Sequence, residues 1–331
     1  MILTEGNRFG QQNPRYRIAS AASPLLHLST AFLASFTAAF ILVSLPALAQ
    51  SVPRLSHRVV GLHEAYVVQK SDTLRSLSSR HGIPVAVLAR DNRLAPAAHL
   101  KVGQTLRIDD RHIVPAELDD GILINVPQLM VFFFKNGTFK AAYPAALGKP
   151  TWQTPHGPFE VVELRRHPVW RVPRSIQREM AMQGKVVKTV VRPGPNNPLG
   201  DYFIALSLPN LGVHATNAPL TIYGFRTHGC IRLHPDDARE LFDQVEPGQA
   251  GEMIYEPALL ARLDDGRVFL EVHADIYGLA FRDTEFIRSL ADSNGLSDLI
   301  NWDAVLDVVR AAEGIARDVT RRGAVSGTTG K

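Results

Sequence analysis

One cysteine and two histidines are the residues of this chain best suited to carry out chemistry. Cys230 is the only cysteine among the 331 residues, and His214 and His228 precede it in the sequence. A cysteine attacks as its thiolate, and because a free thiol titrates near pH ~8.5 it needs a partner that removes its proton. The three residues therefore predict a cysteine nucleophile that uses His214 or His228 as its base.

Two other interpretations of Cys230 are open at this point. Free cysteine is among the most buried residue types, so a single thiol is often inert. A zinc site would bring Cys230 together with His214 and His228, but the segment lacks a second thiol and the usual ligand spacing. We therefore expect neither a metal nor a cofactor, and the neighbours of Cys230 must decide whether it reacts.

The residues around this cysteine resemble the signature of the YkuD-type L,D-transpeptidases. That signature is His-x-Thr-Asn followed, after a gap, by Ser/Thr-His-Gly-Cys-x-Arg-Leu, and its two parts match residues 214–217 and 227–233. Residues 154–157 match the Thr-Pro-x-Gly turn of the same family. Ala215 stands where glycine is usual and Thr227 where serine is commoner. Both substitutions keep the backbone carbonyl or the hydroxyl, so the resemblance favours a reactive cysteine.

The resemblance implies a role for each residue of the site. Cys230 is the nucleophile, and His214 rather than the nearer His228 is the general base, with its imidazole oriented by the carbonyl of Ala215. Backbone N–H groups of His228, Gly229 and Cys230 would stabilise the oxyanion, and one such donor is typically worth about 3 kcal/mol. His228 is expected to line the site, because residues two apart on a strand face the same side. The residues expected to bind substrate are Thr227, Arg232, Asn217 and Tyr223.

The reaction implied by the family is acyl transfer within peptidoglycan. The thiolate takes the acyl group of a tetrapeptide stem with release of D-Ala, and an amine of a second stem then accepts it to give a 3→3 cross-link. The acceptor is open: it could be a lysine of a lipoprotein or other outer-membrane protein, or water in an L,D-carboxypeptidase. A non-catalytic wall-binding protein is the alternative from another class. Arg232 would bind a stem carboxylate or hold the loop.

Short apolar runs separated by turn signals surround these residues and predict the scaffold. Asn136 and Gly137 stand between two apolar runs, which is the strongest short-range signal of a hairpin. Many short strands favour a β-sandwich or barrel-like sheet, which we assign to a catalytic domain at 121–257. A helix is expected at 235–245. The strands are expected at 121–126, 129–134, 139–147, 159–164, 202–206, 211–214, 230–233 and 252–255.

A second pattern precedes this domain and predicts a strand, two helices and a strand within residues 64–109. The first helix is expected to begin with Ser71 or Asp72 as N-cap. The whole pattern resembles a LysM module, which implies binding of a glycan that contains N-acetylglucosamine. In that family the glycan groove would lie between residues 71–74 and 96–100. Peptidoglycan is thus the expected partner of both domains.

The two ends of the chain predict export and a helical extension. Arg15 and Arg17 precede an apolar stretch of about 20 residues, and small residues precede Gln50, as in a secretory signal at 1–49 cleaved after Ala49. An uncleaved membrane anchor is the alternative, and either predicts the periplasm or cell envelope. Residues 258–331 are expected to form a partly helical extension, with a helix at 302–316 and a disordered tail.

The composition agrees with an ordinary globular protein of mixed fold. Apolar residues make up 45% and charged residues 21% of the chain, and the formal net charge is +4. The charges are interspersed, and no run of Lys and Arg marks a nucleic-acid surface. We therefore expect no nucleic-acid partner. The fold class is a strand-rich catalytic domain that follows a small βααβ module and precedes a helical extension.

Overall fold

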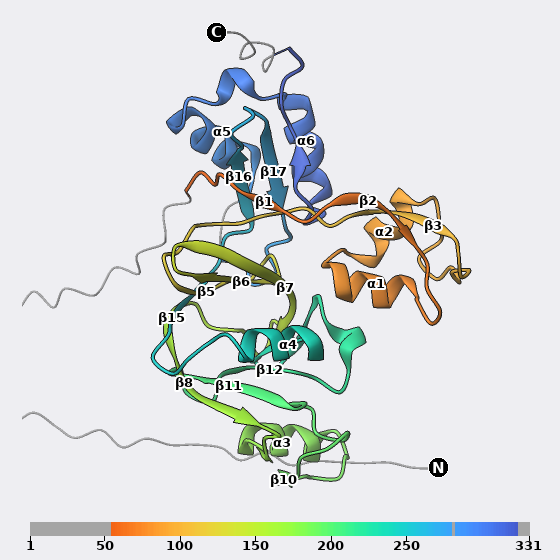
Figure 1. Ribbon diagram of the computed structural model, residues 1–331, viewed down its shortest axis with the longest axis vertical. Helices are drawn as coiled ribbons and strands as arrows, with labels where there is room; N and C mark the ends of the chain where they lie inside the picture. Colours follow the sequence, from red (N-terminus) through yellow and green to blue (C-terminus); the bar gives the residue numbers. More distant parts are fainter. Residues whose placement is uncertain (1–53, 280–281, 324–331) are drawn as a thin grey trace, which may run out of the picture. The chain divides into compact units, whose positions relative to one another are not determined.

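The computed structural model describes residues 54–279 and 282–323 (Figure 1). The predicted signal segment, 1–49, lies outside the described residues, and so does most of the predicted tail. None of the helices in these two ranges has the length and apolar character that crossing a membrane requires.

The first unit is a two-stranded sheet with two helices between its strands. The two strands pair antiparallel, with Tyr66 opposite Leu106, and Leu77 and Leu88 of the two helices are fully buried in a small core. The strand–helix–helix–strand order is the one expected of a LysM module. Its elements are β2 (His63–Val67), α1 (Leu74–His81), α2 (Val85–Asp91) and β3 (Thr105–Asp109).

Helix α1 has a different N-cap from the one expected. The Thr73 hydroxyl accepts a hydrogen bond from the Ser76 N–H at 3.0 Å, and the Ser76 hydroxyl accepts one from the Thr73 N–H at 2.9 Å. This reciprocal capping box satisfies two backbone donors, so the prediction of Ser71 or Asp72 as N-cap is wrong. The Asp72 carboxylate instead accepts a hydrogen bond from the Gln69 N–H at 2.7 Å.

Nine strands of the described chain form the main sheet, whose order closes on itself. The order is β13-β7-β14-β12-β11-β8-β15-β5-β6, and β6 also pairs with β7. Because β7 pairs with both β14 and β6, the strands enclose one apolar core, as a sandwich or barrel does. The strands are β5 (Gly121–Asn125), β6 (Met130–Lys135), β7 (Thr138–Gly148), β8 (Gly157–Arg166), β11 (Tyr202–Leu206), β12 (Gly212–His214), β13 (Gly224–Thr227), β14 (Ile231–Leu233) and β15 (Ala250–Ile254).

The core of this sheet fixes the strands that carry the site. Ile122 of β5 packs in the same cluster as Val213 of β12 and Ile231 of β14, and all three are fully buried. Leu123, the next residue of β5, packs into a second cluster on the other face. Helix α4 (Pro235–Phe242) follows β14 directly and begins at the expected proline, although it ends three residues earlier than expected. Strands β12 and β14 are therefore held from several sides.

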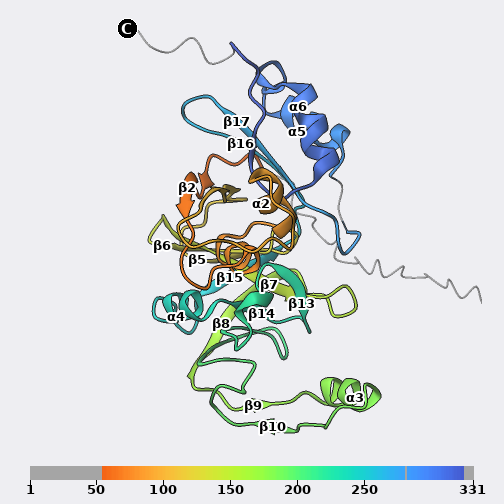
Figure 2. The same cartoon turned by 90° about the vertical axis from the view of Figure 1, so that its right-hand side faces the viewer.

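A long connection between β8 and β11 carries elements that the sequence did not reveal. They are β9 (Trp170–Arg171), α3 (Arg174–Met182) and β10 (Val190–Val191), and β9 pairs antiparallel with β10. We call residues 168–192 the flap, and Figure 2 shows it beyond the end of the main sheet. The two strands have two residues each and α3 has no buried residue, so neither leaves a clear apolar pattern.

The C-terminal unit, residues 258–323 without 280 and 281, combines a sheet with helices. Strands β16 (Ala258–Arg262), β17 (Val268–Val272) and β18 (Arg317–Asp318) form an antiparallel sheet that was not expected in a helical extension. Its helices pack on β16 and β17 around a separate apolar core. The expected helix at 302–316 ends earlier, because Ala312 adopts a left-handed backbone conformation, with φ at 44°. The helices are α5 (Thr284–Ser293), η2 (Ser297–Leu299) and α6 (Trp302–Ala311).

Candidate active site

The cysteine and one histidine lie on, or directly next to, two neighbouring parallel strands. Strands β12 and β14 pair in parallel with Val213 opposite Ile231 and His214 opposite Arg232. Cys230 directly precedes β14 and lies beside Gly212, the first residue of the strand that ends with His214. The Cys230 thiol is half-buried and donates a weak hydrogen bond to the Asn210 carbonyl, with an S–O distance of 3.7 Å.

The imidazole of His214 is buried and has a fixed orientation. Its Nδ1 lies 2.6 Å from the carbonyl oxygen of Ala215, so Nδ1 carries the proton and Nε2 is free to accept one. The ring of Phe203 stacks on it, with the centroids 6.2 Å apart and the planes at 18°. Burial and the nearby positive charge of Arg232 lower the pKa of His214 to about 4. The imidazole is therefore neutral at neutral pH.

The thiol is also neutral in the resting protein. Burial raises the pKa of Cys230, and the hydrogen bond from the Gly212 backbone and the charge of Arg232 offset this only in part. A thiol with a raised pKa beside an imidazole with a lowered pKa is not a preformed thiolate–imidazolium pair. An attack by Cys230 would therefore need a base that takes its proton as the new bond forms.

Hydrogen bonds within the loop between β13 and β14 hold the thiol-bearing residue. The buried Thr227 hydroxyl donates to the Cys230 carbonyl at 2.6 Å and accepts from the Gly229 N–H at 3.2 Å. Gly229 has a φ of 106°, a conformation that favours glycine, and its carbonyl accepts from the Thr154 hydroxyl at 2.8 Å. Thr227 thus braces the loop, and the Gly229 N–H already has a partner.

Comparisons of this chain with family models and with individual proteins point to the same family. Residues 119–254 match the L,D-transpeptidase catalytic domain, and residues 66–109 match the LysM domain. The probable L,D-transpeptidase ErfK/SrfK of Salmonella typhimurium is 31% identical over 232 residues, which are 69% of this chain and 74% of the relative. The chain belongs to the L,D-transpeptidase family.

Other relatives extend over a similar length. The probable L,D-transpeptidase YbiS of Escherichia coli is 28% identical over 254 residues, which cover 75% of this chain and 82% of that protein. Among solved structures, Mycobacterium tuberculosis L,D-transpeptidase 1 is 25% identical and covers 40% of this chain and 60% of its own, with a TM-score of 0.28.

In this member of the family, the second histidine contacts the flap. Residues 228–230 lie between β13 and β14 rather than on a strand, so the strand alternation from which His228 and Cys230 were expected to face the same side does not apply. The Nε2 of His228 lies 2.5 Å from a Glu179 carboxylate oxygen on α3, and its ring meets the Trp152 ring edge-on. The ammonium of Lys149 lies 2.8 Å from the other Glu179 oxygen. His228 therefore connects the loop between β13 and β14 to the flap.

We predict that the negative charge of Glu179 holds the flap in place. Hydrogen bonds from Lys149 and then His228 lower the pKa of Glu179 to about 2, so its stabilising effect is complete above pH ~4.5 and is lost as pH falls toward about 2. We expect Glu179→Gln to speed limited proteolysis within the flap at neutral pH and to lower kcat/KM several-fold.

The control for this prediction is Glu163→Gln, which removes an exposed carboxylate whose partner, Arg165, lies two residues away on β8. Exposed pairs of this kind contribute little to stability. Equal proteolysis rates in the two variants would show that the His228–Glu179 contact does not hold the flap.

The residues expected to bind substrate are not all in one place. The Arg232 guanidinium donates to the Thr221 hydroxyl at 2.9 Å, and its charge acts on both Cys230 and His214. Asn217 is exposed and lines a groove of about 510 Å³ together with Ala215. Tyr223 points elsewhere, since its hydroxyl donates to the Gly314 carbonyl of the C-terminal unit at 3.4 Å.

Several residues that support the site carried no expected role. The Tyr277 hydroxyl donates to the Gly148 carbonyl at 2.5 Å and accepts from the Thr154 N–H at 3.1 Å. The Thr154 hydroxyl also accepts a hydrogen bond from the Gly148 N–H at 2.9 Å. The same hydroxyl donates to the Gly229 carbonyl in the loop between β13 and β14. Thr154 belongs to the recognised Thr-Pro-x-Gly turn, so a signal for it was present. Tyr277 and Glu179 come from segments without a motif, and no local pattern marks them.

Proposed function

We propose that this protein is a peptidoglycan L,D-transpeptidase in which Cys230 is the nucleophile and His214 is the general base. The observation that carries this proposal is the buried, neutral His214 imidazole. Its Nδ1–H is engaged by Ala215, and it ends the strand that neighbours the one following Cys230. A carbonyl acceptor for Nδ1–H takes the place that a carboxylate has in a Ser-His-Asp triad.

The proposed reaction has two half-reactions with one covalent intermediate. The Cys230 proton passes to Nε2 of His214 while sulfur attacks the carbonyl carbon of the third stem residue. The bond to D-Ala then breaks, D-Ala leaves with the proton from His214, and a thioester remains. An acceptor amine attacks the thioester and gives its proton to His214, which returns it to the leaving thiolate.

The negative oxygen of each tetrahedral intermediate needs hydrogen-bond donors. The backbone N–H groups of His228, Gly229 and Cys230 were expected to share this role. Because the Gly229 N–H already donates to Thr227, we assign the oxyanion to the N–H groups of His228 and Cys230. Preorganised donors of this kind stabilise the developing charge without further reorganisation.

Arg232 is proposed to bind a stem-peptide carboxylate. Its Nε is buried without a hydrogen-bond partner in the described structure, and its charge lies close to the thiol. We expect Arg232→Gln to raise KM for a tetrapeptide stem roughly tenfold, since a charge-assisted contact would be lost.

Thr221→Val is the matched control for the Arg232 variant. It removes the hydrogen bond that the guanidinium makes to the protein and leaves the positive charge in place. Steady-state kinetics should then show a change of less than about twofold in KM. Equal effects of the two substitutions would assign Arg232 to holding the loop.

The proposed substrate is wall-linked peptidoglycan, with its glycan bound by the LysM module and its stems by the catalytic domain. Export through the segment 1–49 to the cell envelope is part of this proposal. The acceptor is proposed to be the side-chain amine of a second stem, which gives a 3→3 cross-link. Transfer to a lipoprotein or outer-membrane protein lysine, or to water, uses the same thioester and is distinguished by the product.

Incubation of the purified protein with a disaccharide-tetrapeptide tests the proposal, with products identified by mass spectrometry. A cross-linked dimer with release of one D-Ala supports the transpeptidase. A disaccharide-tripeptide alone identifies a carboxypeptidase, and a dimer formed only when a lysine-bearing acceptor protein is added identifies protein attachment. Absence of D-Ala release in all three reactions would favour a non-catalytic LysM protein.

A further inference from the structure

The C-terminal unit contacts both the segment that precedes the LysM module and the segment that follows it. Before the module, the Ser56 N–H donates to the Leu260 carbonyl and the Arg262 N–H to the Ser56 carbonyl, both at 2.9 Å. β1 (Val59–Val60) then pairs with β4 (His112–Ile113), which follows the module. Beside β4, the Ala316 N–H donates to the Arg111 carbonyl at 2.9 Å. The module is thus not carried on two free linkers.

One residue of the C-terminal unit belongs to the core of the LysM module. The Ile315 side chain is 1% exposed and packs in the cluster that contains Leu77 of α1 and Leu88 of α2. Burying an isoleucine side chain away from water is favourable, so this contact favours one placement of the module against the C-terminal unit.

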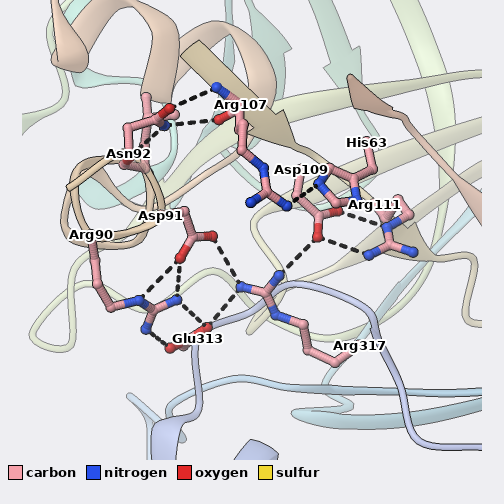
Figure 3. A network of polar contacts seen from close by, with 10 residues as sticks. His63, Arg90, Asp91, Asn92, Arg107, Asp109, Arg111, Glu313 and Arg317 are labelled. Atoms are coloured by element: carbon pink, nitrogen blue, oxygen red, sulfur yellow. Dashed lines mark hydrogen bonds and ion pairs between the residues drawn. The ribbon is translucent and has the colours of Figure 1, made fainter. Parts of the chain in front are cut away.

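Ion pairs link Glu313 and Arg317, which flank Ile315 in sequence, to the LysM module (Figure 3). The Arg317 guanidinium contacts Asp109 of β3 at 2.8 Å, Asp91 of α2 at 3.4 Å and Glu313 at 2.9 Å. Arg90 of α2 pairs with Glu313 from the module side. The side chains of Asp109, Glu313 and Arg317 are 7%, 16% and 26% exposed, so the network is partly shielded from water and stronger than isolated surface pairs.

A buried histidine joins the module, the C-terminal unit and the catalytic domain. The Nδ1 of His112 lies 2.8 Å from a Glu271 oxygen and its Nε2 lies 3.0 Å from the Gly82 carbonyl. Gln128 of the catalytic domain donates to the same Glu271 carboxylate at 3.0 Å. Both ring nitrogens of His112 face acceptors, so each carries a proton, and the imidazolium pairs with a carboxylate from another unit.

The module also touches the segment next to the proposed active site. Helix α1 lies against η1 (Pro219–Thr221) of the catalytic domain. Thr221 is the residue whose hydroxyl accepts a hydrogen bond from Arg232. The placement of α1 is therefore linked, through one short helix, to the charge beside Cys230.

We propose that the C-terminal unit is a brace that fixes the LysM module against the catalytic domain, so that the enzyme acts on stems at a set offset from the glycan strand that the module holds. This inference rests on the proposed function and adds to it a fixed placement of the LysM module relative to the catalytic domain. A binding module raises the effective concentration of a linked substrate only where geometry lets both sites be occupied together. Arg317 and Ile315 are positioning residues in this proposal.

Arg317→Ala and Ile315→Ala test the proposal in the full chain. We expect each variant to lose about tenfold in D-Ala release from intact peptidoglycan, because the linked substrate loses its favourable geometry. Release from a soluble disaccharide-tetrapeptide should stay within about twofold of wild type, and sedimentation with insoluble peptidoglycan should show retained wall binding. The matched control is Arg310→Ala, since Arg310 is 73% exposed and pairs with Asp307 of its own helix at 3.6 Å.

Three other outcomes for the variants would contradict the proposed brace. Equal losses on both substrates would show that the network supports the catalytic fold, and loss of wall binding would show that it supports the LysM fold itself. Variants that keep wild-type activity on intact peptidoglycan would show that placement does not matter. A wild-type protein inactive on both substrates would instead count against the proposed function.

Discussion

Replacing Cys230 by alanine is expected to lower D-Ala release from a disaccharide-tetrapeptide by about 10⁴-fold or more. The variant keeps the proposed oxyanion donors and the substrate contacts, but it has no atom that can form the thioester. Intact-protein mass spectrometry should detect an acyl adduct on the wild type under single-turnover conditions and none on the variant. Carbapenems, which the family resemblance implies as acylating agents, should likewise add to the wild type alone.

The control variants for this prediction keep Cys230 and change Thr227, which is hydrogen-bonded to the same loop. Thr227→Ser retains the hydroxyl that donates to the Cys230 carbonyl and accepts from the Gly229 N–H, so its activity should stay within a few-fold of wild type. Thr227→Val removes both hydrogen bonds and should lower activity much more. A Cys230→Ala variant with more than a tenth of wild-type activity would exclude the thiol as nucleophile.

The parts of the fold that could be predicted correctly are those that local sequence patterns specify. The first LysM helix and the strands of the main sheet follow from apolar periodicity and from turns such as Asn136-Gly137. The β16–β17 hairpin was missed although Asp265 and Gly266 stand between its two apolar strands, a pattern that marks hairpins. The extension was instead expected to be partly helical, with a helix at 302–316 and a disordered tail.

In the candidate site, too, contacts between residues close in sequence could be predicted, and contacts between distant residues could not. The contact between His214 and the Ala215 carbonyl joins adjacent residues, so a motif can encode it. The partner of His228 is Glu179, which is 49 positions away on the flap, and no spacing rule relates the two. Ile315 likewise looks like a residue of its own unit in sequence, and only the fold places it in the LysM core.

His214 is expected to set an unusually low acid limit for activity. Its folded pKa of about 4 lies below the ordinary histidine value of about 6.5, so the base stays unprotonated down to about pH 5. The profile of kcat/KM should therefore be flat through pH 6.5 and fall with an apparent pKa near 4. Between pH ~6.5 and ~4 the unfolded state binds the extra proton, so this residue makes the fold less stable as pH falls.

A second measurement separates general-base catalysis from a preformed ion pair. Because burial raises the pKa of Cys230, iodoacetamide should label it slowly at neutral pH and faster only in alkaline solution. His214→Ala should lower kcat/KM by about 10³-fold or more, whereas His228→Gln should leave the acid limit unchanged because His228 faces Glu179. Rapid labelling at pH 6 together with an acid limit near pH 6.5 would indicate a thiolate–imidazolium pair. An acid limit that moves in His228→Gln would make His228 the base.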